Sequence, residues 1–224
     1  NKLEKDYPHL ILDNSPNKII GGPVSKKFEK STHKQQMLSL SNAFNKDDLE
    51  EFIKRIKKFL YLDDLQNIDF ICEPKIDGLS LNLNYEKGNL ISASTRGDGK
   101  VGENVTNNII NIKDIPKKLI GKNLPNEIEI RGEVFLNKKD FIELNKSLNE
   151  KNKFSNPRNA ASGTLRQKDS KQTSKIPLKF IAYTFGFISE NKFKNQSDFL
   201  NELKSWGFLT SDYNKVIKST DELF

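Results

Sequence analysis

The clearest helical pattern in the chain lies between residues 48 and 60. Its apolar side chains recur at intervals of three and four residues, which places them on one face of a helix. Asn45 stands where an N-cap residue would accept a hydrogen bond from the first turn. Two further helices are predicted over residues 140–148 and 197–206, and Gly207 is placed to end the second one.

Alternation with a period of two indicates strands in other parts of the chain. From residue 68 onward, Cys72 falls on the apolar side of a predicted strand, whereas Glu73 and Lys75 fall together on its other side. Residues 79–85 and 90–96 alternate in the same way on either side of a turn, and this pattern predicts a β-hairpin.

A further alternating stretch places Glu129, Arg131 and Glu133 on one polar side of a strand over residues 128–134. Another strand is predicted over residues 180–187. Strands and helices do not alternate one for one along the chain. The pattern therefore predicts an α+β fold with antiparallel sheets flanked by helices.

The start of the chain has a different character. Residues 3–12 form a short segment that ends in a turn-rich run, and Gly21-Gly22-Pro23 breaks the chain again. We expect the tail of another unit and a linker here, followed by one main domain.

Composition narrows the classes of function. The net charge of +7 and the pI of about 9.2 favour an anionic partner such as nucleic acid, although a general excess of lysine explains them equally well. The apolar runs are far shorter than the roughly 20 residues of a membrane span, so no membrane partner is expected. Cys72 is the single cysteine, which excludes an internal disulfide and favours a cytoplasmic location. Because it falls on the apolar side of the predicted strand, we expect it to be a small buried hydrophobic residue.

The candidate chemistry begins at Lys75-Ile76-Asp77-Gly78, a lysine at a strand end followed by a carboxylate and a glycine. Taken alone, this tetrad indicates a structural turn more readily than a catalytic site. Its meaning changes because other motifs accompany it, namely the runs at 37–42 (MLSLSN), 95–99 (TRGDG), 129–135 (EIRGEVF) and 156–166 (NPRNAASGTLR).

Together these motifs closely resemble those of the NAD-dependent bacterial DNA ligases, from about residue 10 to the end of the chain. The resemblance implies a nucleotidyltransferase (ATP-grasp-like) fold. It also implies that Lys75 attacks the α-phosphate of NAD, releases nicotinamide mononucleotide and carries AMP. The AMP then moves to the 5′-phosphate of a DNA nick, which the 3′-hydroxyl seals, as needed in DNA replication and repair.

The same resemblance assigns roles to individual residues. Lys75 and Asp77 are the catalytic candidates, although Asp77 could orient the turn or help to position a metal ion. The candidates for nucleotide contact are Ser39, Leu40, Glu73, Lys75, Arg96, Glu133 and Tyr183. Arg158 and Arg166 are expected at the 5′-phosphate of the nick, where the small residues around them would let the backbone approach phosphate.

Each of these residues could instead have a purely structural role. Leu38 and Leu40 could belong to the core, Glu133 could be the ion-pair partner of Arg131, and Tyr183 could pack among the neighbouring phenylalanines. Arg96 could be a solvated turn residue. Arg158 and Arg166 could be plain surface charges.

The implied cofactors are NAD and Mg²⁺ (or Mn²⁺), and the implied partners are nicked double-stranded DNA and NAD or AMP, with the protein expected to be a monomer. No metal site is assigned within the chain. Bound Mg²⁺ and nearby arginine, rather than Glu73, are expected to lower the cost of freeing the Lys75 amine for attack. Zn²⁺ is expected only in a region beyond residue 224.

The resemblance also sets the expected domain limits. Residues 1–24 are expected to be a remnant of the nicotinamide-gripping domain with a linker. Residues 25–224 are expected to be the adenylation domain, truncated at its C-terminal end and therefore slow to self-adenylate with NAD. Gln36 stands where the family more often has proline, and we expect this difference to affect only the local loop.

Two rival functions stay open. An ATP-dependent ligase or a capping-type nucleotidyltransferase shares the Lys-x-Asp-Gly tetrad. A nucleic-acid-binding module without catalysis would also account for the basic charge. A dehydrogenase is disfavoured, since no Gly-x-Gly-x-x-Gly run follows a strand and opens a helix.

Overall fold

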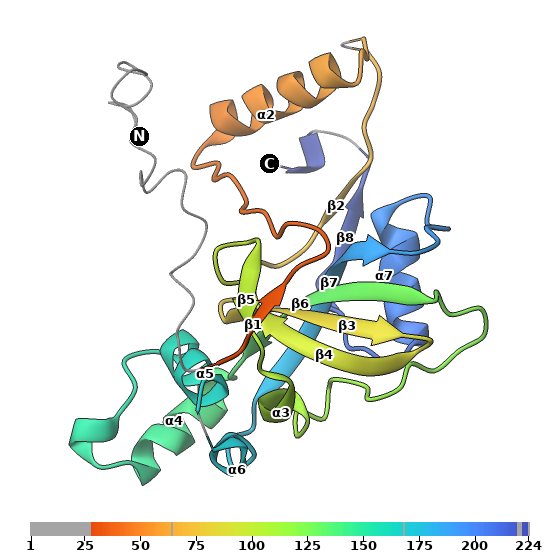
Figure 1. Cartoon of the computed structure of the whole chain (residues 1–224). Helices are drawn as coiled ribbons and strands as arrows, with labels where there is room; N and C mark the ends of the chain where they lie inside the picture. Colours follow the sequence, from red (N-terminus) through yellow and green to blue (C-terminus); the bar gives the residue numbers. More distant parts are fainter. Residues whose placement is uncertain (1–27, 64, 168, 219–220, 224) are drawn as a thin grey trace, which may run out of the picture. The chain divides into compact units, whose positions relative to one another are not determined.

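The computed structural model describes residues 28–63, 65–167, 169–218 and 221–223 (Figure 1). The chain folds into two compact units. The first unit comprises the described residues up to Leu38 together with Ile76–Thr210. The second unit comprises Ser39–Lys75 and the described residues from Ser211 onward.

A four-stranded antiparallel sheet forms the centre of the first unit. Its strand order is β4 (Asn89–Thr95), β3 (Leu79–Glu86), β6 (Glu127–Phe135) and β7 (Lys179–Ile188). β3 and β4 are the predicted hairpin. Lys87 and Gly88 connect them with φ values of 48° and 77°, the left-handed conformation whose twist matches that of the paired strands. The predicted hairpin is confirmed, and so are the strands predicted over residues 128–134 and 180–187, which are β6 and β7.

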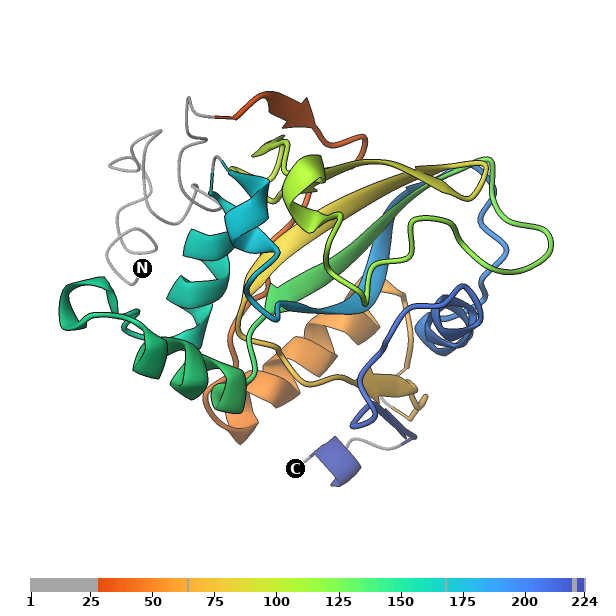
Figure 2. The same ribbon diagram turned by 90° about the horizontal axis from the view of Figure 1, so that it is seen from below.

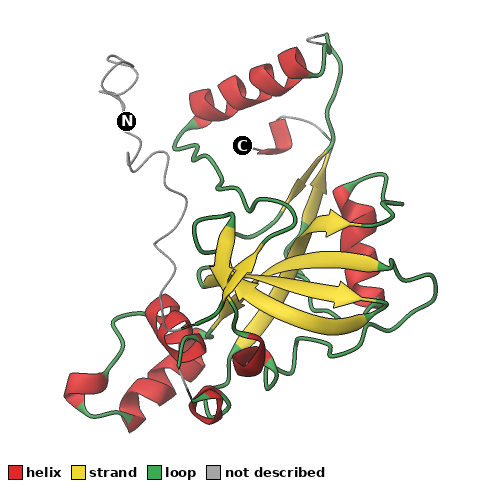
Figure 3. Cartoon of the chain, viewed as in Figure 1, coloured by secondary structure: helices red, strands yellow, loops and turns green. Residues whose placement is uncertain are grey.

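The remaining elements of the first unit surround this sheet (Figure 3). A second antiparallel pair joins β1 (Lys30–Thr32) to β5 (Val101–Glu103). The short helices gather at one end of the sheet, in both views of the molecule (Figures 1 and 2). They are α3 (Thr106–Ile109), α4 (Lys138–Ser147), η2 (Glu150–Asn152), α5 (Pro157–Leu165) and α6 (Ser170–Thr173), while α7 (Gln196–Ser205) lies beside β7.

One face of the sheet is apolar and forms the core. Tyr85 and Phe180 contact Phe208 with ring centroids 5.9 and 6.1 Å apart, and Phe199 of α7 packs on Phe185 at 4.8 Å. Alternate positions of the strands supply the rest of this face, namely Leu81, Leu83, Ile128, Ile130 and Val134. α7 and the residues after it therefore close the core, because their aromatic rings fill the space above the sheet.

The opposite face of β6 is buried as well, although its side chains are charged. Glu129 is 2% exposed, and Arg131 and Glu133 are each 8% exposed. A strand that is buried on both faces and polar on one must satisfy its charged groups internally. This requirement shapes the candidate site described below.

The second unit contains helix α2 (Lys46–Phe59), the antiparallel strands β2 (Phe70–Cys72) and β8 (Lys215–Ile217), and the turn η3 (Asp221–Leu223). The α2 prediction is confirmed. Asn45 caps the helix by accepting a hydrogen bond from the backbone of Asp48 at 2.8 Å.

Three expectations need correction. β2 begins at Phe70 and ends at Cys72, so Glu73 and Lys75 lie beyond the strand and no strand pleat places them on one face. Cys72 is half-buried rather than fully buried. The alanine- and glycine-rich run 157–165 is the helix α5, so its interior backbone groups serve the helix instead of approaching phosphate.

The expected segment over residues 3–12 and the break at residues 21–23 lie outside the described residues. Mixed helices and antiparallel sheets confirm the α+β class. Within the described ranges, no helix combines the length and the apolar character needed to cross a membrane.

We predict that Leu83→Ala lowers the free energy of unfolding by about 2–5 kcal/mol, because this side chain is 0% exposed and its removal leaves a cavity. Urea denaturation measures the change. Ile91→Ala on β4 is the matched control, since Ile91 is 50% exposed, and it should cost about 1 kcal/mol or less. Equal losses for the two variants would contradict the assignment of the core.

Candidate nucleotide site

The Lys-x-Asp-Gly tetrad spans the point in the sequence at which the chain passes from the second unit to the first. Lys75 is the last residue of its stretch of the second unit, and Ile76 begins the main stretch of the first. Lys75 and Asp77 are both exposed and both lie outside regular secondary structure. Gly78 is required for packing, because a Cβ atom there would lie 2.1 Å from the carbonyl oxygen of Val134 on β6. The glycine thus lets the backbone at residue 78 lie directly against β6.

Around Ser80, the first unit brings three of the predicted nucleotide-contact residues together. The Ser80 hydroxyl donates to the carboxylate of Glu133 at 2.8 Å, and its carbonyl accepts from the backbone of Arg96 at 3.2 Å. The Ser80 side chain also forms a hydrogen bond with Tyr183. Glu133, Arg96 and Tyr183 therefore gather beside the first residues of β3, two positions after Gly78.

Tyr183 owes its position to a β-bulge. Gly132 of β6 pairs with Ala182 and Arg131 pairs with Thr184, so Tyr183 is the extra residue between them. A bulge redirects the side chain that it carries. Burial raises the pKa of Tyr183, the negative charge of Glu133 raises it further, and Ser80, Arg131 and Arg96 oppose the rise. The phenol is therefore neutral at pH 7.

Two of the purely structural roles can now be compared with the contacts. Arg131 forms an ion pair with Glu129 at 3.7 Å, and Glu133 accepts a hydrogen bond from Ser80. Tyr183 is half-buried, unlike Phe180, which is fully buried in the core.

Arg96 is held by a tightly bonded turn. The carboxylate of Asp98 accepts from the backbone N–H groups of Val101 and Lys100 at 2.8 and 2.9 Å. These two bonds lower the pKa of Asp98. Gly99 closes the turn by donating to the carbonyl of Arg96 at 3.0 Å. Arg96, which is half-buried, therefore extends from a backbone that these hydrogen bonds fix.

Arg158 and Arg166 belong to α5 and its C-cap, and both are ion-paired. Arg158 contacts the carboxylate of Asp77 at 2.9 Å, and both side chains are more than half exposed. Arg166 forks onto Glu103 with two contacts of 2.7 Å, and the Glu103 side chain is only 3% exposed. The structure thus brings Arg158 to the tetrad, whereas Arg166 is tied to β5.

The remaining nucleotide candidates belong to the second unit. Ser39 and Leu40 are exposed, and Glu73 is half-buried. The expectation that Leu38 and Leu40 could be core residues is wrong, since they are 70% and 77% exposed.

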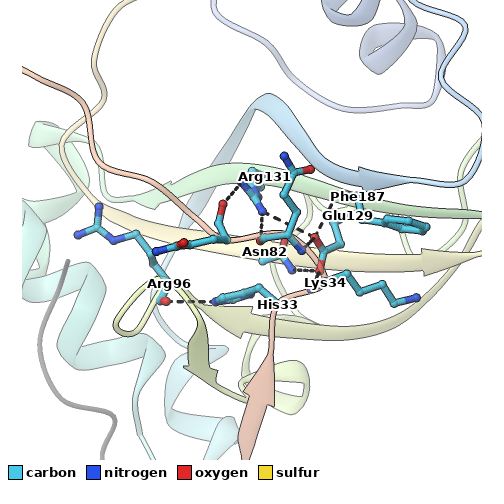
Figure 4. Close-up of polar contacts among 9 residues, drawn as sticks. His33, Lys34, Asn82, Arg96, Glu129, Arg131 and Phe187 are labelled. Carbon is cyan, nitrogen blue, oxygen red and sulfur yellow. Dashed lines mark hydrogen bonds and ion pairs between the residues drawn. The ribbon is translucent and has the colours of Figure 1, made fainter. Parts of the chain in front are cut away.

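Sequence analysis missed a polar cluster within the first unit (Figure 4). Glu129 accepts from the backbone of Lys34 at 2.8 Å and from the side chain of Asn82 at 3.1 Å. Arg131 donates to the carbonyl of Gln36 at 3.2 Å. The polar alternation of β6 was a signal for these residues. Their partners, however, lie far away in the sequence: Asn82 is 47 positions from Glu129, and Lys34 and Gln36 are each 95 positions from the residue that they contact.

Comparison with known proteins assigns the chain to one family. The model of the NAD-dependent DNA ligase adenylation domain matches residues 25–224. The chain belongs to that family.

Curated relatives named DNA ligase support the same membership. The chain is 52% identical to the protein of Pelagibacter ubique (strain HTCC1062), over 96% of this chain and 31% of that protein. It is 50% identical to that of Bartonella henselae over 99% of the chain and 31% of the relative, and 47% identical to that of Rickettsia akari over 100% and 32%. The chain therefore spans about a third of the length of these relatives.

We predict that His33 makes the stability of this ligase-family domain sensitive to acid. Its Nε2 donates to the carbonyl of Arg96 at 3.1 Å, and burial lowers its pKa below the ordinary 6.5. As the pH falls below 6.5, His33 becomes protonated in the unfolded chain while it stays neutral in the folded chain. The free energy of unfolding therefore decreases with falling pH. Thermal unfolding at about pH 7.5 and about pH 5.5 should show a smaller drop in Tm for His33→Gln than for the parent. The same drop in both proteins would contradict the prediction.

Proposed function

We propose that the full-length protein is an NAD-dependent DNA ligase and that this chain is its adenylation domain. The match of the family model to residues 25–224, which include Lys75 in its tetrad, is the observation that carries the proposal. In the first step, the neutral amine of Lys75 forms a bond to the α-phosphorus of NAD. The bond from that phosphorus to nicotinamide mononucleotide breaks, and the amine proton passes to solvent.

Two further transfers complete the reaction. A 5′-phosphate oxygen at the nick attacks the AMP phosphorus, and Lys75 departs as the amine. The 3′-hydroxyl then attacks the 5′-phosphate, loses its proton and displaces AMP. A phosphodiester bond thus joins the two ends of the nick, as DNA replication and repair require.

The contacts of the first unit suit the nucleotide roles that we propose. Tyr183 offers a neutral ring for stacking on adenine. Glu133, held by Ser80, is placed to accept from a ribose hydroxyl. Arg96 is placed to fork onto phosphate oxygens. We propose that Ser39, Leu40 and Glu73 supply further nucleotide contacts from the second unit.

We also propose that Mg²⁺ or Mn²⁺ takes part, bound through the phosphates of NAD. The described ranges contain no group of three or more His, Cys, Asp or Glu residues that could hold a metal ion. Mg²⁺ keeps several waters and is commonly held by substrate phosphates and one or two carboxylates, for which Glu133 and Asp77 are candidates. When bound, the cation would neutralise phosphate charge that opposes an incoming amine.

The distribution of charge supports a nicked duplex as the partner. Residues 138–175 contain ten lysines and arginines but only four acids, a net charge of +6 out of +7 for the whole chain. The described lysines of this stretch are exposed and lie on the elements from α4 to α6. We propose that this basic surface, with Arg158 and Arg166, binds the phosphates of DNA. We propose a monomer working in the cytoplasm.

We predict that Lys75→Ala abolishes the AMP adduct in the full-length protein, because no other group can take the place of the amine in the P–N bond. The protein is incubated with NAD and Mg²⁺, the adduct is found by mass spectrometry, and nicotinamide mononucleotide is measured in equal amount. Lys113→Ala, at another exposed lysine, is the control and should form the adduct normally. Nick sealing by Lys75→Ala, or pyrophosphate release with ATP in place of NAD, would overturn the proposal.

We predict that a triple variant of the basic surface, Lys146→Ala, Lys151→Ala and Lys171→Ala, weakens binding to nicked DNA. The slope of log K against log salt should fall by about 0.9 for each lysine that contacts a phosphate. Fluorescence anisotropy over a range of salt concentrations measures this slope.

The control triple variant removes the same charge elsewhere, at exposed lysines outside residues 138–175. It combines Lys122→Ala, Lys194→Ala and Lys204→Ala. It should keep the parent slope, and an equal reduction in both variants would show that the DNA does not prefer the basic surface.

A further inference from the structure

The polar face of β6 grips a segment that has no regular structure, residues 33–37, here called the anchored segment. Lys34 and Gln35 donate their backbone N–H groups to the two oxygens of Glu129, at 2.8 and 3.3 Å. Arg131 donates in return to the carbonyls of Gln35 and Gln36, at 2.5 and 3.2 Å (Figure 4). One acid and one base thus satisfy four backbone groups of residues 34–36 that no strand pairs.

Both ends of the anchored segment are fixed to the turn that carries Arg96. His33 donates from its backbone to the carbonyl of Lys100 at 2.9 Å, and its ring donates to the carbonyl of Arg96. Met37 donates to the carbonyl of Gly99 at 2.8 Å and is itself 3% exposed. The segment and this turn are therefore held as one piece of structure.

The chain changes character immediately after Met37. Leu38 and Leu40 are 70% and 77% exposed, and Ser39 between them is exposed too. Large apolar side chains exposed beside a rigid anchor are suited to contacting a ligand. Their placement depends on the anchor, because the covalent chain leaves a fixed point only one residue earlier.

The geometry points to Glu129 and Arg131 as positioning residues for nucleotide binding, acting through the anchored segment on Ser39 and Leu40. This inference rests on the proposed function, since it takes Ser39 and Leu40 as nucleotide contacts. A buried ion pair is a poor means of stabilising a fold compared with apolar packing. Here both of its members are occupied with backbone groups of one loop, so the pair fixes a conformation of that loop.

The neighbouring strand is adapted to the same pair. A Cβ atom on Gly186 of β7 would lie 2.4 Å from Nη2 of Arg131 and 2.6 Å from a carboxylate oxygen of Glu129. Phe187, the next residue, donates its backbone N–H to Glu129 at 3.1 Å. Any side chain at position 186 would displace the pair while leaving both charges in place.

The test compares NAD kinetics of Lys75 adenylation in the full-length protein and its Glu129→Gln variant. A glutamine amide has one oxygen acceptor and cannot replace both carboxylate oxygens, so the anchored segment is released. We expect KM for NAD to rise by at least about tenfold, with the rate at saturating NAD changing by less than about threefold. Hydrogen exchange at the amides of Lys34 and Gln35 should become faster in the same variant.

Glu127→Gln is the matched control. Glu127 lies on the same face of β6, two residues earlier, and binds the Lys34 side chain at 2.5 Å instead of the backbone. It should leave KM and the exchange of both amides unchanged. A rise in KM in Glu127→Gln equal to that in Glu129→Gln would overturn the inference, because the backbone contacts would then not matter.

Gly186→Ala keeps the inference testable if Glu129→Gln does not fold. It should raise KM for NAD in the same way, although both charged side chains are retained. A folded Glu129→Gln or Gly186→Ala protein with KM within about twofold of the parent would sink the positioning role alone. Absence of the Lys75 adduct in the parent protein would instead refute the proposed function.

Discussion

The first unit is organised by the need to satisfy buried charge on one face of a central strand. One side of β6 packs against the aromatic core. The charged side chains of the strand lie on its other side, where Glu129, Arg131 and Glu133 are buried as well. Glu129 meets this need with donors from Lys34, Gln35, Asn82 and Phe187, which come from three separate parts of the chain. The charged strand therefore fixes the loop around Lys34 and Gln35 and is itself bonded to the neighbouring strands β3 and β7.

The same constraint explains why the nucleotide candidates gather at one end of β3. Glu133 is bonded to Ser80, the register shift at Gly132 presents Tyr183 beside them, and Gly78 lies directly against β6. The register shift is a departure from regular sheet structure. Sites for chemistry commonly use such departures, because they direct side chains that an ideal pleat would place elsewhere.

Sequence alone predicted the elements that repeat over enough residues to show a period. α2 and the β3–β4 hairpin are of this kind, and the Lys75 tetrad was found through its companion motifs. Strands of three residues, such as β1 and β8, are too short for a period of two to be visible. Asn156 and Pro157 are typical of the N-terminus of a helix and indicate α5, whereas the alanine and glycine residues that follow also suit a loop that approaches phosphate. The bulge at Tyr183 and the grip on residues 34–36 depend on contacts between distant positions, which no local pattern contains.

Contacts made to main-chain atoms leave the side chains of a loop free to vary. Arg131 binds Gln36 through its carbonyl, a group that proline at this position would offer equally well. An exchange of glutamine for proline at this position would thus leave the contact with Arg131 unchanged. Evolution can exchange residues along such a loop while its path stays constant, provided that the two charges below are kept.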